Sequence, residues 1–113
     1  MRIFVDDERN PREGLFDYVF RNGEEFFQFL KENNIKHVEL LSLDHDLGST
    51  EILDGYDIVK LLPDFLNSIR VIQFHTKNNI GFENMLHYAL NIQKHNIIEI
   101  GYVDNRQLDS RFF

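Results

Sequence analysis

The chain has 113 residues and no cysteine, and its 19 acidic residues outnumber its 12 lysines and arginines, giving a formal net charge of −7. This length fits one domain, residues 1–113; the lack of cysteine excludes disulfides and thiolate metal sites, and the charge argues against an extended nucleic-acid groove. No apolar run approaches the roughly 20 residues that span a bilayer, and charge interrupts the N-terminal apolar run too early for a signal peptide. We therefore expect a cytoplasmic domain with no membrane partner.

Five short apolar runs along the chain are typical of buried strands. Most are almost continuous in apolar residues, as expected for parallel strands that are covered on both faces. Polar segments rich in Gly, Pro and Asn separate several of them from the next element of the chain. The predicted strands are residues 2–5, 16–20, 37–43, 69–74 and 97–103.

Three segments between these runs have the spacing of amphipathic helices. The first follows Asn22, which is a good N-cap with Glu25 three residues later, as in a capping box. The second is expected to be capped by Asp54 and ended by Pro63. The third is predicted at 82–93, where apolar residues recur at helical spacing.

The order of these elements predicts the fold class. Strands that alternate with helices favour an open parallel sheet with right-handed crossovers. At this length we expect a single flavodoxin-like α/β domain with a five-stranded, mostly parallel sheet of order 2-1-3-4-5 and helices on both faces. In that order the first, third and fourth strands are neighbours, and ligands bind at their carboxyl ends.

Ionisable or polar residues follow each of these three strands. Carboxylates that lie within a few ångströms repel one another, so such a cluster favours a cation or shared protons. A hard divalent ion with oxygen ligands, Mg²⁺ or Mn²⁺, is the natural cofactor. The predicted metal ligands are Asp6, Asp7, Asp44 and Asp46, and the strand ends also deliver His45, His75 and Thr76.

Five of these residues also have a structural interpretation. Asp6 or Asp7 could cap the connection after the first strand, and Asp46 could form an Asx-type turn. His45 and His75 could be hydrogen-bonded structural histidines. A functional site is favoured because all the structural interpretations would have to hold at the same crevice.

Several motifs together resemble one family. "VDDER" with the nearby Pro11, "SLDHDLG", "GYDIV" and "FHTKNNIGFENM" are similar to the cyclic-phosphate processing receiver domains, over positions 3 to about 90. Thr76 stands where that family commonly has serine, and Asn79 where it commonly has proline. The resemblance implies a receiver-like fold and the handling of cyclic phosphates in RNA-repair or conflict systems.

With this resemblance, we expect a metal-dependent phosphoesterase that hydrolyses or processes a cyclic phosphate, carried by an RNA 2′,3′-cyclic end or by a cyclic nucleotide. His45 and His75 would serve as acid and base, and Asp44 would act beside them at the metal. The residues expected to bind the substrate are Arg9, Thr76, Lys77 and Asn78.

Two alternatives stay open. In a phospho-accepting receiver, Asp44 would be the nucleophile, although such receivers carry a lysine after the fifth strand and "EIGYVDN" offers none. In a non-catalytic nucleotide-binding module, the same residues would hold the ligand without turning it over. The sequence predicts no oligomeric state.

Overall fold

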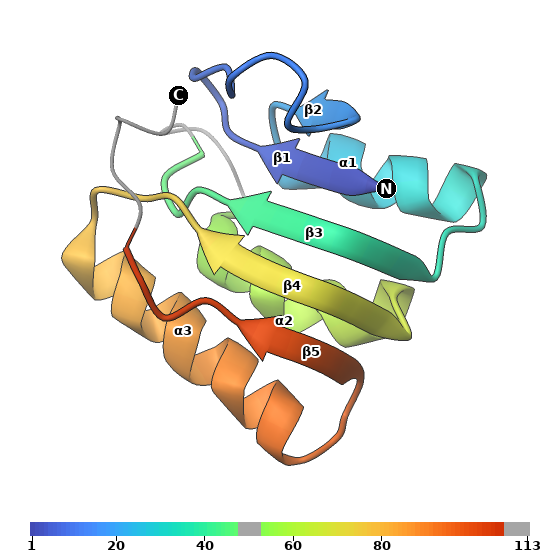
Figure 1. The fold of residues 1–113 in the computed structure, drawn as a ribbon, viewed down its shortest axis with the longest axis vertical. Helices are drawn as coiled ribbons and strands as arrows, with labels where there is room; N and C mark the ends of the chain where they lie inside the picture. Colours follow the sequence, from blue (N-terminus) through green and yellow to red (C-terminus); the bar gives the residue numbers. More distant parts are fainter. Residues whose placement is uncertain (48–52, 108–113) are drawn as a thin grey trace.

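The computed structural model describes residues 1–47 and 53–107, and its five strands form one sheet of order β2-β1-β3-β4-β5 (Figure 1). Every neighbouring pair is parallel. The predicted α/β class and strand order are therefore confirmed, with a sheet that is entirely rather than mostly parallel. The strands are Arg2–Val5 (β1), Tyr18–Phe20 (β2), His37–Leu43 (β3), Ser68–Phe74 (β4) and Glu99–Val103 (β5).

The register of the sheet brings three strand ends into line. Val5 of β1 is the partner of Leu43 in β3, and Leu43 is the partner of the last residue of β4. The ladder continues one step further, because Asp44 N–H donates to the Val5 carbonyl (3.0 Å) and His75 N–H donates to the Leu43 carbonyl (2.9 Å). The polar residues that follow β1, β3 and β4 are thus held at one edge of the sheet.

Three helices begin at polar caps. They are Gly23–Glu32 (α1), Gly55–Phe65 (α2) and Asn79–Lys94 (α3). Asn22 and Asp54 cap α1 and α2 as predicted, each accepting a backbone N–H three residues on. Asn78 caps α3, so this helix begins three residues before the predicted start.

Pro63 does not end α2, although the sequence predicts that it should. The helix continues to Phe65, and Leu66 N–H still donates to the Leu62 carbonyl at 2.8 Å. A proline in the last turn removes one backbone hydrogen bond. Leu62, the residue before the proline, is fully buried in the core.

The three helices lie on one face of the sheet, where α1 contacts α2 and α2 contacts α3 (Figure 1). The sequence predicts helices on both faces, and this prediction is wrong. The difference arises because the connection between β1 and β2 contains no helix, and no helix follows β5 in the described part of the chain. Right-handed crossovers then place the remaining three connections on the same side.

The opposite face of the sheet is partly covered by the β1–β2 connection. Phe16 of this connection packs against Phe4 of β1, with ring centroids 5.2 Å apart. The main apolar core lies between the sheet and the helices, and includes Ile3, Val5, Leu41, Leu43, Ile58, Leu62, Ile72, Phe74, Met85 and Ala89.

Among the described helices, none combines the length and the hydropathy needed to cross a bilayer.

Candidate functional site

A cavity of about 640 Å³ opens at the carboxyl edge of the sheet. Among the described residues, six carboxylates and two cationic side chains contribute to its wall, so this part of the cavity has an excess of negative charge. An anionic ligand is repelled from such a cavity unless a cation accompanies it. The lining residues are Asp6, Asp7, Glu8, Arg9, Asp44, Asp46, Leu47, Asp54, Thr76 and Lys77.

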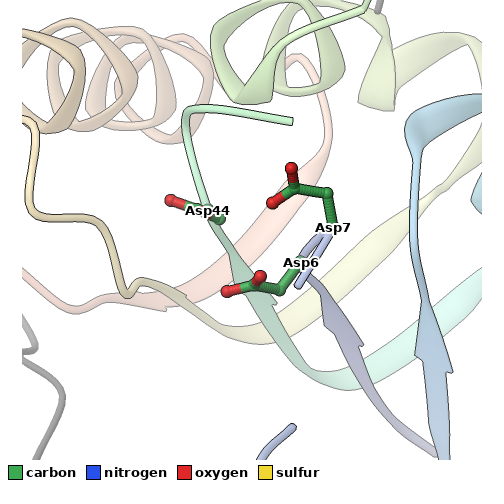
Figure 2. Close-up of side chains that lie close together, drawn as sticks. All are labelled: Asp6, Asp7 and Asp44. Atoms are coloured by element: carbon green, nitrogen blue, oxygen red, sulfur yellow. The ribbon is translucent and has the colours of Figure 1, made fainter. Parts of the chain in front are cut away.

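Three of these carboxylates converge at one point. One oxygen atom from each of Asp6, Asp7 and Asp44 lies within 4.8 Å of the other two. Figure 2 shows the first two side chains at the end of β1 and the third at the end of β3. We call Asp6, Asp7 and Asp44 the acidic trio. Asp46, the fourth predicted ligand, lines the cavity outside this trio, and its side chain is exposed.

Asp6 is fully buried and accepts four hydrogen bonds from residues in the described part of the chain. Its Oδ1 accepts the backbone N–H groups of Glu8 (2.9 Å) and Arg9 (2.8 Å), while its Oδ2 accepts Arg9 Nε–H (2.9 Å) and lies 3.1 Å from His75 Nε2. Burial raises the pKa of this carboxyl. The His75 and backbone hydrogen bonds and the Arg9 charge outweigh burial, so its pKa lies well below the ordinary value.

Arg9 is a cation held between two members of the acidic trio. Besides its bond to Asp6, its Nη2 donates to the His75 carbonyl (2.7 Å) and lies 3.5 Å from Asp44 Oδ2. A phosphate-binding role was predicted for Arg9. In the structure it lines the cavity while its guanidinium already serves these partners, so its charge offsets part of the carboxylate repulsion.

Asp44 has the opposite protonation tendency to Asp6. Burial and then the negative charge of Asp6 raise its pKa to about 6, although Arg9, the His45 N–H group and the Thr76 side chain pull it down. One guanidinium therefore does not compensate the acidic trio. Three carboxylates beside one guanidinium leave room for two further positive charges, and oxygen ligands are those that Mg²⁺ and Mn²⁺ prefer. The residues fit a hard divalent cation.

His75 lies behind Asp6 and does not line the 640 Å³ cavity. Its side chain is 1% exposed, stacks on Phe4 with centroids 4.2 Å apart, and places Nδ1 2.7 Å from Ser42 Oγ. Burial lowers its pKa, although the Asp6 carboxylate opposes this shift. The sequence correctly predicts that His75 lies at this edge of the sheet, but the His75 ring contacts Asp6 instead of facing the cavity.

His45 lies at the margin of the cavity, between two carboxylates that line it. Its Nδ1 is 3.0 Å from Asp46 Oδ1, and its Nε2 is 3.7 Å from Asp54 Oδ2. The ring packs on the backbone of α3 at Gly81, where an added Cβ would lie 2.4 Å from the imidazole Cγ. Glycine is therefore required at position 81 for the ring to keep this place.

The three residues after His75 have different surroundings. Thr76 is buried, lines the cavity, and its hydroxyl accepts Asn78 N–H (3.1 Å). Lys77 lines the cavity with an exposed side chain. Asn78 uses its side-chain oxygen to cap α3 by accepting Gly81 N–H (2.9 Å), so it organises the turn.

Three residues that build the site were not predicted from the sequence. Asp54 was predicted only as a helix cap, but it also lines the cavity. Arg21 donates to the backbone carbonyls of Asp6 (3.2 Å) and Arg9 (2.8 Å), which fixes the loop after β1. Ser42 Oγ contacts His75 Nδ1 (2.7 Å). The sequence feature that could have identified Ser42 is a polar residue within the apolar run that forms β3.

Comparison with protein families gives one match that covers most of the chain. The model of the cyclic-phosphate processing receiver domain matches residues 1–91, a range that contains the acidic trio, Arg9, His45 and His75. Comparisons with curated proteins and with solved structures gave no match. The match and the fold agree, and the chain belongs to the cyclic-phosphate processing receiver domain family.

Proposed function

We propose that this domain is a metal-dependent phosphoesterase that hydrolyses a cyclic phosphate, carried by an RNA 2′,3′-cyclic end or by a cyclic nucleotide. The observation that carries the proposal is the acidic trio, which converges in an open cavity of a chain from a cyclic-phosphate processing family. The chain has no cysteine, which suits a cytoplasmic enzyme.

We infer that a divalent cation is the cofactor of this cavity. Asp6, Asp7 and Asp44 would hold it, with Asp46 nearby. Bound there, Mg²⁺ or Mn²⁺ would neutralise charge on the phosphoryl oxygens and lower the pKa of a water molecule. Four hydrogen bonds already occupy the Asp6 carboxylate, so Asp7 and Asp44 have more capacity left for direct coordination.

The cationic and hydroxyl groups of the cavity would orient the phosphate. Lys77 is exposed at the rim and supplies a mobile positive charge, and the Thr76 hydroxyl lies in the wall. Arg9 adds a fixed positive charge, because its guanidinium is held by Asp6 and by the His75 carbonyl. These groups would stabilise the negative charge that develops on the phosphate in the transition state, and the dianionic product, only when a cation neutralises the carboxylates of the acidic trio.

Hydrolysis of the cyclic ester breaks one P–O bond, adds the oxygen of water to phosphorus and gives a phosphomonoester and a free ribose hydroxyl. One proton must leave the attacking water, and one must reach the departing ribose oxygen. His45 lies at the cavity margin and is our candidate for proton transfer. His75 is not, because it is buried and both of its ring nitrogens face protein partners.

The test is incubation of the purified domain with a panel of 2′,3′-cyclic nucleotides, 3′,5′-cyclic nucleotides and RNA with a 2′,3′-cyclic end. Each substrate is supplied with Mg²⁺, Mn²⁺ or EDTA, and ³¹P NMR follows the conversion of cyclic ester to monoester. We expect metal-dependent turnover of one class and its loss in Asp7→Asn. Turnover that persists in EDTA, or that Asp7→Asn leaves unchanged, contradicts the proposal.

A binding module is the second candidate, because no histidine is among the described residues that line the cavity. It predicts that one member of the panel binds tightly with metal and is recovered unchanged.

A phospho-accepting receiver is the third candidate, because Asp44 lies at the end of β3 with its carboxylate in the cavity. Treatment with acetyl phosphate and Mg²⁺ followed by mass spectrometry would show a phosphorylated Asp44.

A further inference from the structure

A continuous row of polar side chains runs through the sheet to the acidic trio. Gln73 Nε2 donates to Ser42 Oγ (3.1 Å), Ser42 Oγ lies 2.7 Å from His75 Nδ1, and His75 Nε2 lies 3.1 Å from Asp6 Oδ2. Ser42 and Gln73 do not line the 640 Å³ cavity. They lie instead beside a separate cavity of about 220 Å³, which is also lined by Phe4 and Phe16.

The chemistry of the groups gives this row one direction. An ionised Asp6 carboxylate only accepts hydrogen bonds, so His75 Nε2 must carry the proton that faces it. In the neutral ring Nδ1 is then an acceptor, and the Ser42 hydroxyl must donate to it. The amide of Gln73 supplies the donor that the Ser42 oxygen accepts. Each link is satisfied with a single choice of proton positions.

Stacking alone does not select this arrangement. The His75 ring lies almost parallel to Phe4, with an angle of 6° between the planes, and a half-turn of the ring would preserve that contact. The half-turn would put carbon atoms where the two nitrogen atoms now face Ser42 and Asp6. Phe4 therefore sets the plane of the ring, whereas the hydroxyl and the carboxylate set its orientation within that plane.

We propose that Ser42 is a positioning residue of the acidic site. Its hydroxyl fixes the orientation and tautomer of His75, and His75 in turn fixes the Asp6 carboxylate that holds Arg9 beside Asp44. The consequence for cation binding rests on the proposed function, whereas the consequence for His75 and Arg9 does not. Ser42, which lines the 220 Å³ cavity, thus controls the geometry of the 640 Å³ cavity without lining it.

Two substitutions of nearly equal shape separate the hydroxyl from the volume of the side chain. Ser42→Thr keeps the hydroxyl and adds a methyl group, whereas Ser42→Val carries two methyl groups and no hydroxyl. The adjoining 220 Å³ cavity leaves room for the added atoms. Ser68→Ala is the matched control. It removes a serine–histidine contact between the same two strands, Ser68 Oγ to His37 Nδ1 (2.5 Å), at the opposite end of the sheet.

The measurements are the ¹⁵N shifts of the His75 ring, hydrogen exchange at Arg9 Nε–H and the affinity for Mn²⁺. In Ser42→Val we expect the Nδ1 signal to move toward that of a nitrogen without a hydrogen bond. Arg9 Nε–H should exchange about tenfold faster, as for loss of one supporting hydrogen bond. Mn²⁺ should bind roughly 10–100-fold more weakly, as for other partners of metal ligands. Ser42→Thr and Ser68→Ala should resemble the wild type.

Unchanged His75 shifts in Ser42→Val overturn the inference. A changed ring with wild-type exchange at Arg9 Nε–H also overturns it, because Ser42 would then hold the ring without holding Asp6. If the wild type binds no Mn²⁺, the metal proposal fails, and the ring and Arg9 measurements still decide the role of Ser42. If Ser42→Val does not fold, Ser42→Ala gives the same readings without added bulk, and the same directions are expected.

Discussion

Asp6 and Asp44 face one another at the ends of neighbouring strands, and their pKa values move in opposite directions. Both carboxylates are buried, so burial alone does not distinguish them. The difference comes from the donors. Asp6 accepts four hydrogen bonds from described residues. Asp44 accepts hydrogen bonds from the His45 N–H group and the Thr76 side chain, lies 3.5 Å from Arg9 Nη2, and is repelled by Asp6. The edge of the sheet therefore holds one stable anion and one that costs free energy to ionise.

Ionisation of Asp44 should make the metal-free protein less stable as pH rises. Its folded pKa of about 6 lies above the ordinary value of 3.8, so the stability it contributes is present below the ordinary value and is lost as pH rises through about 6. A shift of this size corresponds to about 3 kcal/mol. We expect Asp44→Asn to be more stable than the wild type at about pH 8 and to lose this advantage near pH 4.

Urea unfolding in EDTA at both pH values measures this difference. Asp46→Asn is the control, because the Asp46 side chain is 67% exposed. A stability difference between Asp44→Asn and wild type that stays constant with pH would sink the prediction.

Neutralising Asp6 should have the opposite effect to neutralising Asp7. Asp6→Asn brings an amide N–H₂ group close to the N–H donors of Glu8, Arg9 and His75, and it leaves Arg9 without its buried anion. Removal of one partner of a buried ion pair lowers the free energy of unfolding by roughly 3–5 kcal/mol. Asp7→Asn relieves repulsion within the acidic trio and should be neutral or stabilising. Chemical unfolding of both variants in EDTA makes the comparison. Equal losses in the two variants would show that Asp7 also has a structural role.

Replacement of the two histidines should separate proton transfer from positioning. His45→Ala should lower the single-turnover rate by ~10²–10⁴ while Mn²⁺ affinity stays close to wild type. His75→Ala should lower the unfolding free energy and the Mn²⁺ affinity together, because Asp6 loses a hydrogen bond inside the protein. Rates, metal affinity and urea unfolding are measured on both. His87→Ala, on the exposed face of α3, is the control. A wild-type rate in His45→Ala would exclude the proposed proton transfer.

Phosphate ligands should bind only when a divalent cation is present, because six carboxylates of residues that the structure describes line the cavity. Calorimetric titration with the best cyclic phosphate should show binding in Mg²⁺ and none in EDTA. Lys77→Ala should weaken the binding in Mg²⁺ by up to about fivefold, the effect of an exposed charge. Lys94→Ala, in the last turn of α3, should have no effect. Tight binding in EDTA would mean that the ligand avoids the acidic trio.

The convergence of the strand ends could be predicted from the sequence, whereas the direction of His75 was missed. Apolar runs that end in Asp6, Asp44 and His75 fix the position of these residues in a parallel sheet. Alternation along β4 also places Gln73 and His75 on one side and Phe74 on the other. The partners of His75 are Asp6, which follows β1, and Ser42 in β3. The register between these strands cannot be predicted from the local sequence pattern.

The one-sided helix layer was also implicit in the element order. No helical periodicity appears between β1 and β2, and the other three crossovers share one hand. The continuation of α2 past Pro63 to Phe65 was not predicted from the local sequence pattern. The roles of Arg21 and Ser42 likewise depend on contacts between distant segments.

The short edge strand β2 has a consequence for local unfolding. It has three residues and carries Arg21 at its end, and Arg21 holds the backbone of Asp6 and Arg9. Edge strands of this length open more readily than central ones, without unfolding the rest of the domain. Opening of β2 would remove the two Arg21 hydrogen bonds from the loop that carries Asp6 and Asp7, while Asp44 keeps its place at the end of the central strand β3. The backbone on one side of the acidic trio is therefore supported by the shortest strand of the sheet.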